Sequence, residues 1–417
     1  MIIRELRHAR EIIGELACLK QDLVVFLGIY NSAEFFSKLE KWLPRLDTKG
    51  APMLVVDNHS SDETWEWVKE RLGQLLEGRP VVYVRNPVNL GATGSLALNM
   101  DILAGAKWVM TLHQDDEYLP THVEEHKKVI LTAPVNLGMI SSESRSVSPK
   151  GKTLSYPRGA WFLASMASPA DIFIAHLKNH SYPFSGATFS IKMLQEIPIL
   201  WHSTAFPDTE MVLKALPKWG FHYIPKSTVR YLENPASESH ALNGYQRDLG
   251  AFLALVRVFR CQEFSKLLRT LPLEQVRDFS IGLNDGLKIR LKDPTLLGLI
   301  QAIAQEAVVE ECGPSRTGTE FLAPAFLDLG DHQAAATLSN LANFAPLERA
   351  EAAQDPIIFF SQDSSYNSPQ GAGILTRLAP ALLGLLPPAL GRFLYTKYLE
   401  LPFLNRSRSQ WNFKWRR

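Results

Sequence analysis

The chain has 417 residues, more than one hydrophobic core usually serves, so its length predicts two or three domains. Its net charge of +1 provides no overall field that would draw the protein onto nucleic acid or an anionic membrane. With 46% hydrophobic and 21% charged residues, the composition excludes a mainly disordered protein. Cys18, Cys261 and Cys312 are far apart and form no CxxC pair, which favours a reducing, cytoplasmic location.

The two ends of the chain are considered first for targeting and membrane segments. Residues 1–21 carry charges where a signal peptide would be uniformly apolar, so we expect an amphipathic helix there. The longest apolar stretch, residues 378–390, is short for a membrane-spanning helix and contains three prolines. We therefore expect this stretch to touch a membrane surface at most.

Residues 23–120 alternate short apolar runs with helical periodicity, the pattern of βαβ units around a parallel sheet. The predicted strands cover residues 23–30, 52–57, 80–86 and 107–113. A less regular part follows, with a strand expected at 183–191 and a helix starting at 207. The predicted organisation is the N-terminal helix (1–21), an α/β domain (22–245), a mainly helical region (246–373) and an amphipathic, basic C-terminal segment (374–417).

Polar clusters follow three of the predicted strands: YNS, DNHSSD and HQDD. Ligands of open α/β sheets bind beyond the carboxyl ends of the strands, where these clusters fall. Asp57 ends its strand and could accept a hydrogen bond from a base or a sugar hydroxyl. A structural reading of the same stretch is equally open, because Ser60 and Glu63 have the spacing of a helix capping box.

The HQDD cluster indicates a cation site. If the strand continued past His113, Asp115 would share its face, roughly 6–7 Å away, and Asp116 would lie on the other face. Mg²⁺ and Mn²⁺ commonly take one or two carboxylates and complete their coordination with phosphate oxygens and water. The two acids therefore favour a metal shared with a phosphate, with a solvated turn as the alternative.

Three further positions have both a functional and a structural interpretation. Gly91 lies in a turn that would let backbone approach a ligand, although the turn lacks the GxGxxG pattern of dinucleotide sites. Asp208 stands at a predicted helix start, where it could cap the helix or act as a general base. His240 could ligate a metal or simply be exposed.

Taken together and in order, these segments resemble the family 2 glycosyltransferases, whose catalytic domain has the GT-A fold. The resemblance covers about residues 22–240 and rests on FLGIYNS, VVDNHSSDET, NLGATGSLALN, LHQDDEYLP and PDTEMVLKA. It implies a catalytic base, metal ligands, an acceptor contact and a nucleotide-sugar site. The implied catalytic base is Asp208 and the implied acceptor contact is Glu210. The implied metal ligands are Asp115 and Asp116, to which we add His240. The implied nucleotide-sugar site consists of Tyr30, Asn31, Asp57, Asn89, Gly91, His113 and Asp115.

The resemblance implies an inverting, metal-assisted transfer from a nucleotide-sugar donor, foremost a UDP-sugar, to a saccharide or lipid-linked acceptor. The expected cofactor is Mn²⁺ or Mg²⁺. Two positions depart from the family pattern: His113 replaces the first Asp of Asp-x-Asp, and Pro207 replaces an acid before Asp208. These departures leave open a non-catalytic sugar-nucleotide-binding or partner subunit. A nucleotidyltransferase is disfavoured because residues 28–36 lack a glycine-rich basic loop.

The C-terminal residues 404–417 contain five basic and three aromatic side chains and no acid. This composition suits the anionic inner face of a membrane, where each basic residue contributes about 1 kcal/mol. A solvated tail is the alternative. Nucleic acid is not expected as a partner, because only this terminus is basic.

Overall fold

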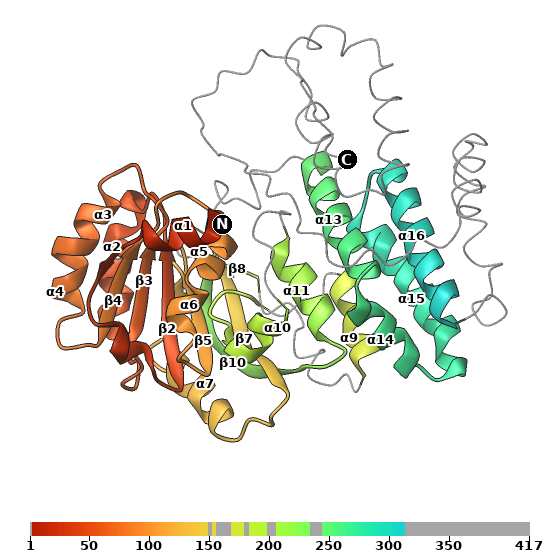
Figure 1. Cartoon of the computed structure of the whole chain (residues 1–417), viewed down its shortest axis with the longest axis horizontal. Helices are drawn as coiled ribbons and strands as arrows, with labels where there is room; N and C mark the ends of the chain where they lie inside the picture. Colours follow the sequence, from red (N-terminus) through yellow and green to blue (C-terminus); the bar gives the residue numbers. More distant parts are fainter. Residues whose placement is uncertain are drawn as a thin grey trace, which may run out of the picture. The chain divides into compact units, whose positions relative to one another are not determined.

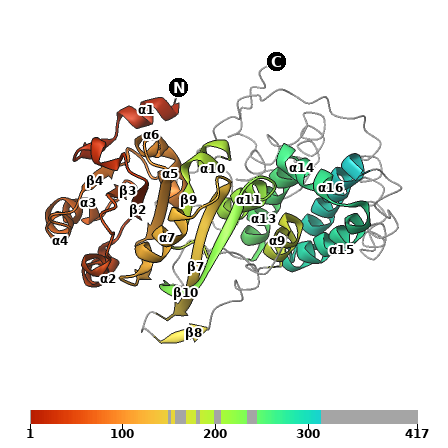
Figure 2. The same ribbon diagram turned by 90° about the horizontal axis from the view of Figure 1, so that it is seen from below.

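The computed structural model describes residues 2–148, 152–155, 168–178, 183–197, 206–233 and 244–312 (Figures 1 and 2). All of them belong to one compact unit. Across these ranges, no helix combines the length and apolar character needed to cross a membrane.

The strands of the described ranges form a ten-stranded mixed sheet in the order β1-β4-β3-β2-β5-β9-β7-β10-β6, with β8 paired to β7. Strands β4, β3, β2 and β5 run parallel, as do β7 and β10, while β9 joins the two groups by antiparallel pairing. The strands are β1 Glu11–Ile13, β2 Leu23–Ile29, β3 Met53–Asp57, β4 Val81–Arg85, β5 Trp108–His113, β6 Glu117–Tyr118, β7 Leu137–Val147, β8 Thr153–Ser155, β9 Thr188–Ser190 and β10 Gly220–Leu232.

Helices cover the sheet and form the region that follows it. The α-helices are α1 Ile2–His8, α2 Phe36–Trp42, α3 Thr64–Trp67, α4 Gly73–Leu75, α5 Gly91–Leu98, α6 Met100–Leu103, α7 His122–Leu131, α9 Pro169–Leu177, α10 Ile191–Glu196, α11 Pro207–Ala215, α13 Gly244–Phe259, α14 Gln262–Thr270, α15 Leu273–Arg290 and α16 Pro294–Cys312. Shorter turns are the 3₁₀ helices η1 Leu16–Leu19, η2 Ala33–Phe35 and η3 Leu43–Arg45, and the π-helix η4 Val68–Leu72. The predicted fold class, a mixed, mainly parallel sheet followed by helices, is confirmed.

The central strands are apolar throughout because both of their faces are covered. In β2, Val25 and Leu27 belong to one hydrophobic cluster, whereas Val24 and Phe26 belong to the cluster on the other face. Helix α2 and the α3–η4 segment pack on the first face, and α5 and α6 contribute to the second. This two-sided burial is typical of parallel sheets and explains why these strands read as continuous apolar runs.

The N-terminal segment differs from the sequence prediction. Helix α1 ends at His8, and residues 11–13 add to the sheet as an antiparallel edge strand beside β4, so the expected helix over residues 1–21 is wrong beyond its first turns. The guanidinium of Arg10 holds this segment in place by donating to Asp101 at 2.7 Å. The strand expected at 183–191 is likewise reduced to β9.

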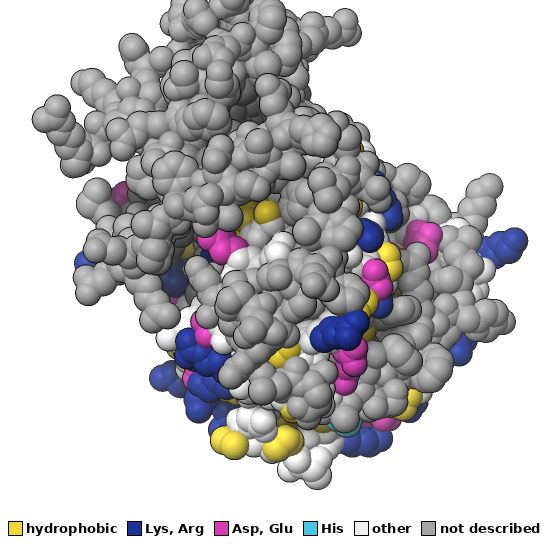
Figure 3. All heavy atoms as spheres, turned by 90° about the vertical axis from the view of Figure 1, so that its right-hand side faces the viewer, with side chains coloured by type: hydrophobic (Ala, Val, Ile, Leu, Met, Phe, Trp, Pro, Cys, Tyr) yellow, Lys and Arg dark blue, Asp and Glu magenta, His cyan; other side chains and the backbone are white. Residues whose placement is uncertain are grey.

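The helices after residue 244 pack around a cluster of aromatic rings that includes a residue of α9. The ring of Phe173 lies 5.4 Å from Phe264 and 5.9 Å from Phe279. Helix α9 thus joins the helical region although it precedes α11 in the chain. On the face in Figure 3, the acidic and basic side chains that are coloured are interspersed, in keeping with the near-zero net charge.

Candidate active site

The carboxyl ends of β3, β2 and β5 lie side by side and bring the three polar clusters together. In the sheet register, Ile29 of β2 pairs with Asp57, and Gly28 pairs with His113. The turn that follows β2 therefore lies between the ends of its two neighbouring strands. The register thus brings together the clusters that the sequence places at the ends of these strands.

The turn after β2 is fixed by contacts to both neighbours. Asn31 has a left-handed backbone, with φ of 45°, a conformation that Asn adopts more readily than most residues. Its side-chain oxygen accepts from the Ser61 N–H at 2.9 Å. On the other side, the Gln114 amide accepts from the Tyr30 N–H at 2.6 Å and donates to the Tyr30 carbonyl at 2.9 Å. The Tyr30 backbone and the Asn31 side chain are thus both held by neighbouring loops.

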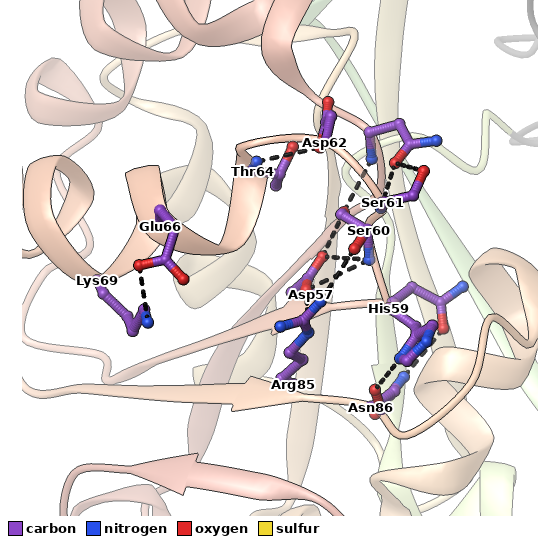
Figure 4. Close-up of polar contacts among 12 residues, drawn as sticks. Asp57, His59, Ser60, Ser61, Asp62, Thr64, Glu66, Lys69, Arg85 and Asn86 are labelled. Atoms are coloured by element: carbon purple, nitrogen blue, oxygen red, sulfur yellow. Dashed lines mark hydrogen bonds and ion pairs between the residues drawn. The ribbon is translucent and has the colours of Figure 1, made fainter.

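Asp57 lies fully buried at the end of β3 (Figure 4). Its carboxylate accepts hydrogen bonds from the N–H of Ser60, at 3.1 Å, and from the Ser60 hydroxyl, and forms an ion pair with Arg85 at 3.3 Å. Burial raises the pKa of Asp57, and the Ser60 hydrogen bonds and the Arg85 charge oppose that rise. Contact between Asp57 and a nucleotide base stays a prediction.

The capping box expected from Ser60 and Glu63 does not form. The Ser60 hydroxyl is directed to Asp57, and no side chain caps α3 at Glu63. Asp62 instead accepts from the N–H of Thr64 at 3.0 Å. The Ser60 hydroxyl therefore binds the Asp57 carboxylate at the end of β3 and does not cap helix α3.

The loop containing Asn89 and Gly91 is held by Asn58. The Asn58 amide donates to the Asn89 side-chain oxygen at 2.6 Å and to the Gly91 carbonyl at 3.1 Å. Gly91 has φ of +71°, which favours glycine, and a Cβ there would meet no atom within 4 Å. Glycine is therefore required by backbone conformation, and open space beside it leaves room for a ligand.

The HQDD residues form a turn in which three potential ligands converge. Strand β5 ends at His113, and the Asp116 N–H donates to the His113 carbonyl at 3.4 Å. The expected alternation of Asp115 and Asp116 between opposite faces is therefore wrong, because the chain turns. One ligand atom from each of His113, Asp115 and Asp116 lies within 4.8 Å of the others. Two carboxylates and an imidazole fit Mn²⁺, which tolerates nitrogen ligands better than Mg²⁺ does.

The two aspartates of this turn have different surroundings. Asp116 is fully buried and accepts from the Leu232 N–H at 2.8 Å and from the Ser185 hydroxyl. Burial, with a smaller contribution from the Asp115 charge, raises the pKa of Asp116 to about 6. Asp115 is half-buried, and its backbone carbonyl accepts from the Lys38 ammonium. Burial lowers the pKa of Lys38, and the charges of Asp116 and Asp115 oppose that effect.

Asp208 lies in the first turn of α11, where its side chain makes no N-terminal cap because Phe206 occupies that position. Burial raises the pKa of Asp208, while the Thr209 N–H and the charges of Arg290 and His113 lower it. Arg290 ends α15, so the helical region also acts on this carboxylate.

Glu210 and His240 complete the residues predicted from the sequence. Glu210 is buried, and its oxygens accept from Lys214 at 2.6 Å and from Arg257 at 2.8 Å. The carboxylate thus joins α11 to α13, and its predicted contact with an acceptor stays a prediction. His240 lies outside the described residues.

Residues 32–197 match the family described as glycosyl transferase family 2. The chain contains a family 2 glycosyltransferase domain. This match and the sheet confirm the resemblance and the fold class, and they identify a glycosyltransferase domain over the matched residues. No curated protein matches the chain significantly.

Solved structures similar to this chain have low sequence identity to it. S. aureus TarS 1–349 in complex with UDP-GlcNAc is 13% identical, with 70% of this chain and 89% of that chain covered and a TM-score of 0.46. The mannosyltransferase PcManGT from Pyrobaculum calidifontis, in complex with GDP-Man and Mn²⁺, is 13% identical, with 77% and 84% covered and a TM-score of 0.45. Glucosyl-3-phosphoglycerate synthase from Mycobacterium tuberculosis is 16% identical, with 58% and 83% covered and a TM-score of 0.37.

Several residues of the glycosyltransferase site were not predicted from the sequence. Gln114 clamps the Tyr30 backbone, and Arg85 pairs with Asp57. A charged residue ending an otherwise apolar strand was an available signal for Arg85. Ser185, which donates to Asp116, lies 69 residues further along the chain and carries no local signal.

Proposed function

We propose that the chain transfers a sugar from a nucleoside diphosphate donor, foremost a UDP-sugar, to an acceptor hydroxyl with inversion of the anomeric centre. The observation that carries this proposal is the convergence of His113, Asp115 and Asp116 at the end of β5, within a family 2 domain. The adjacent ends of β2 and β3 supply the predicted nucleotide contacts. A divalent cation, Mn²⁺ or Mg²⁺, is the proposed cofactor.

Asp115 is the principal carboxylate ligand in this proposal. Its side chain is half-buried and, within the part of the chain that the structure describes, receives no hydrogen bond, whereas Asp116 is buried and occupied by two donors. His113 supplies an imidazole nitrogen to the same site. A bound cation would stabilise the negative charge that develops on the departing diphosphate.

Asp208 is the proposed general base. An acceptor hydroxyl is a weak nucleophile at neutral pH until a positioned base takes its proton. The raised pKa of Asp208 brings this carboxylate closer to the working pH, which makes it a better proton acceptor. Direct displacement by the activated hydroxyl would invert the anomeric centre.

The test is a panel of nucleotide sugars with Mn²⁺, scored for release of free nucleotide. We expect release from at least one donor, loss in excess chelator, and a decrease of more than tenfold in Asp115→Asn. The matched control is Asp22→Asn, which changes an exposed aspartate paired with Lys107 before the start of β2. Full activity in chelator would contradict the metal role. Binding without release from any donor would favour a non-catalytic subunit.

A saccharide or lipid-linked acceptor in glycan or polysaccharide synthesis completes the proposal. A lipid-linked acceptor would place the enzyme at the cytoplasmic face of a membrane, with the basic segment 374–417 as the contact. That segment lies outside the described residues. Vesicle flotation of the full chain and of a truncation ending at residue 373 tests this contact, and equal membrane recovery of the two proteins argues against it.

A further inference from the structure

Two buried hydroxyls connect the ends of the HQDD turn from outside it. The Tyr118 hydroxyl lies 2.8 Å from the His113 backbone nitrogen and 2.8 Å from the Ser185 hydroxyl. The Ser185 hydroxyl in turn contacts the Asp116 carboxylate. Tyr118 is only 1% exposed and Ser185 only 5%. Water therefore has little access to these bonds.

The direction of each hydrogen bond follows from its two ends. The His113 N–H can only donate, so the Tyr118 oxygen accepts from it. An ionised Asp116 can only accept, so the Ser185 hydroxyl donates to it. Since the Ser185 proton is already used, the Tyr118 hydroxyl must donate its own proton to the Ser185 oxygen. The three hydrogen bonds thus form a chain from the His113 N–H to the Asp116 carboxylate, in which each donor has an acceptor.

A buried histidine holds the backbone next to Ser185. His122 lies 3.0 Å from the Gly186 carbonyl through Nε2 and 2.7 Å from the Thr228 hydroxyl through Nδ1. Burial lowers the pKa of His122 to about 4, so the ring is neutral at physiological pH, and Nε2 carries the proton because a carbonyl can only accept. Gly186 has φ of +73°, and a Cβ there would lie 2.7 Å from the His122 ring. Ser185 therefore has little freedom to move.

We propose that Tyr118 and Ser185 are positioning residues that set the cation affinity of the HQDD turn. They link the backbone of His113 to the side chain of Asp116 and so fix the turn that holds His113 and Asp115, the two proposed ligands. This inference rests on the proposed function, since it concerns the same cation. Outer partners that orient metal ligands commonly change metal affinity by about 10–100-fold when removed.

The experiment compares two variants that each delete one hydroxyl with two that delete a hydroxyl elsewhere. Tyr118→Phe and Ser185→Ala are tested in the full chain. The controls are Tyr83→Phe, on strand β4, and Ser280→Ala, on helix α15. Ser280 is also 5% exposed, and its hydroxyl donates to the Val276 carbonyl. The controls thus match the variants in residue type, and the serines also match in burial.

The measured quantity is the dissociation constant of Mn²⁺, followed by electron paramagnetic resonance of the free ion, first alone and then with UDP. We expect an increase of about tenfold or more in Tyr118→Phe and Ser185→Ala, with both controls within about twofold of the unsubstituted chain. Thermal unfolding of all four variants provides the comparison for stability. Mn²⁺ binding should weaken even where the midpoint of unfolding matches that of a control.

The outcomes separate this inference from the proposed function. If the unsubstituted chain binds Mn²⁺ and both variants bind it equally well, the positioning role is wrong and the metal-assisted function survives. A loss of thermal stability with unchanged Mn²⁺ affinity also overturns the positioning role, because it indicates packing alone. If the unsubstituted chain binds no Mn²⁺ in either titration, the cation assignment and this inference fail together.

Discussion

Replacing Glu210 by Gln distinguishes an ion pair that joins two helices from the acceptor contact predicted by sequence. The carboxylate is 2% exposed and binds Lys214 and Arg257. Gln keeps the shape but removes the charge, and losing one member of a buried pair costs about 3–5 kcal/mol. Lys214 retains 16% side-chain exposure and can turn towards water, so we place the loss near the lower end, at about 3 kcal/mol.

Urea unfolding followed by circular dichroism measures this loss. The control is Glu196→Gln, whose surface pair with Lys218 should contribute about 1 kcal/mol or less. We also expect the KM for the acceptor to stay unchanged in Glu210→Gln. A loss of less than about 1 kcal/mol together with a tenfold rise in that KM would refute the ion-pair reasoning and restore the acceptor role.

Two further predictions concern pH. Arg290→Met removes a positive charge that lowers the pKa of Asp208, so the acid limb of the pH profile of kcat/KM should move to higher pH. The control Arg269→Met, which breaks a surface ion pair with Glu311, should leave that limb in place. An unmoved acid limb in Arg290→Met would contradict the coupling between Arg290 and Asp208. Burial lowers the pKa of His122 from 6.5 to about 4, so as the pH falls below 6.5 the unfolded chain binds a proton there before the folded chain does. The free energy of unfolding should therefore decrease by on the order of 3 kcal/mol between pH 6.5 and pH 4. His122→Gln should flatten this fall in urea unfolding, and equal slopes would count against it.

The sequence predicts the central sheet well because its physical signal is local. Strands β2 and β3 are buried on both faces, so each appears as a continuous apolar run bounded by polar turns. The edge strand β1 carries no such signal: all three of its residues are exposed, and it pairs through backbone groups of β4. Whether residues 11–13 continue a helix or join the sheet depends on the free edge of β4, which exists only once the chain has folded.

The candidate site divides in the same way. Asp57 and His113 end the strands on either side of β2, because parallel strands end at one edge, a geometry that strand prediction already contains. The turn after His113 was mispredicted because strand periodicity was extended past the end of β5. Ser185 could not be predicted from one sequence, since its role depends on the antiparallel pairing of β9 with β5 beside it.

Burial separates the acids of this site into two groups. Asp57 and Asp116 are fully buried, and both carboxylates accept hydrogen bonds, Asp57 from Ser60 and Asp116 from Ser185 and Leu232. A buried, ionised carboxylate is unfavourable without such donors, and the hydrogen bonds that stabilise it also hold the surrounding backbone in place. Asp115 is half-buried and keeps lone pairs that no described residue occupies, so it can meet a ligand without disrupting the fold. In the proposed function the two adjacent acids therefore have separate tasks: Asp116 holds the turn, and Asp115 presents its charge to the cation.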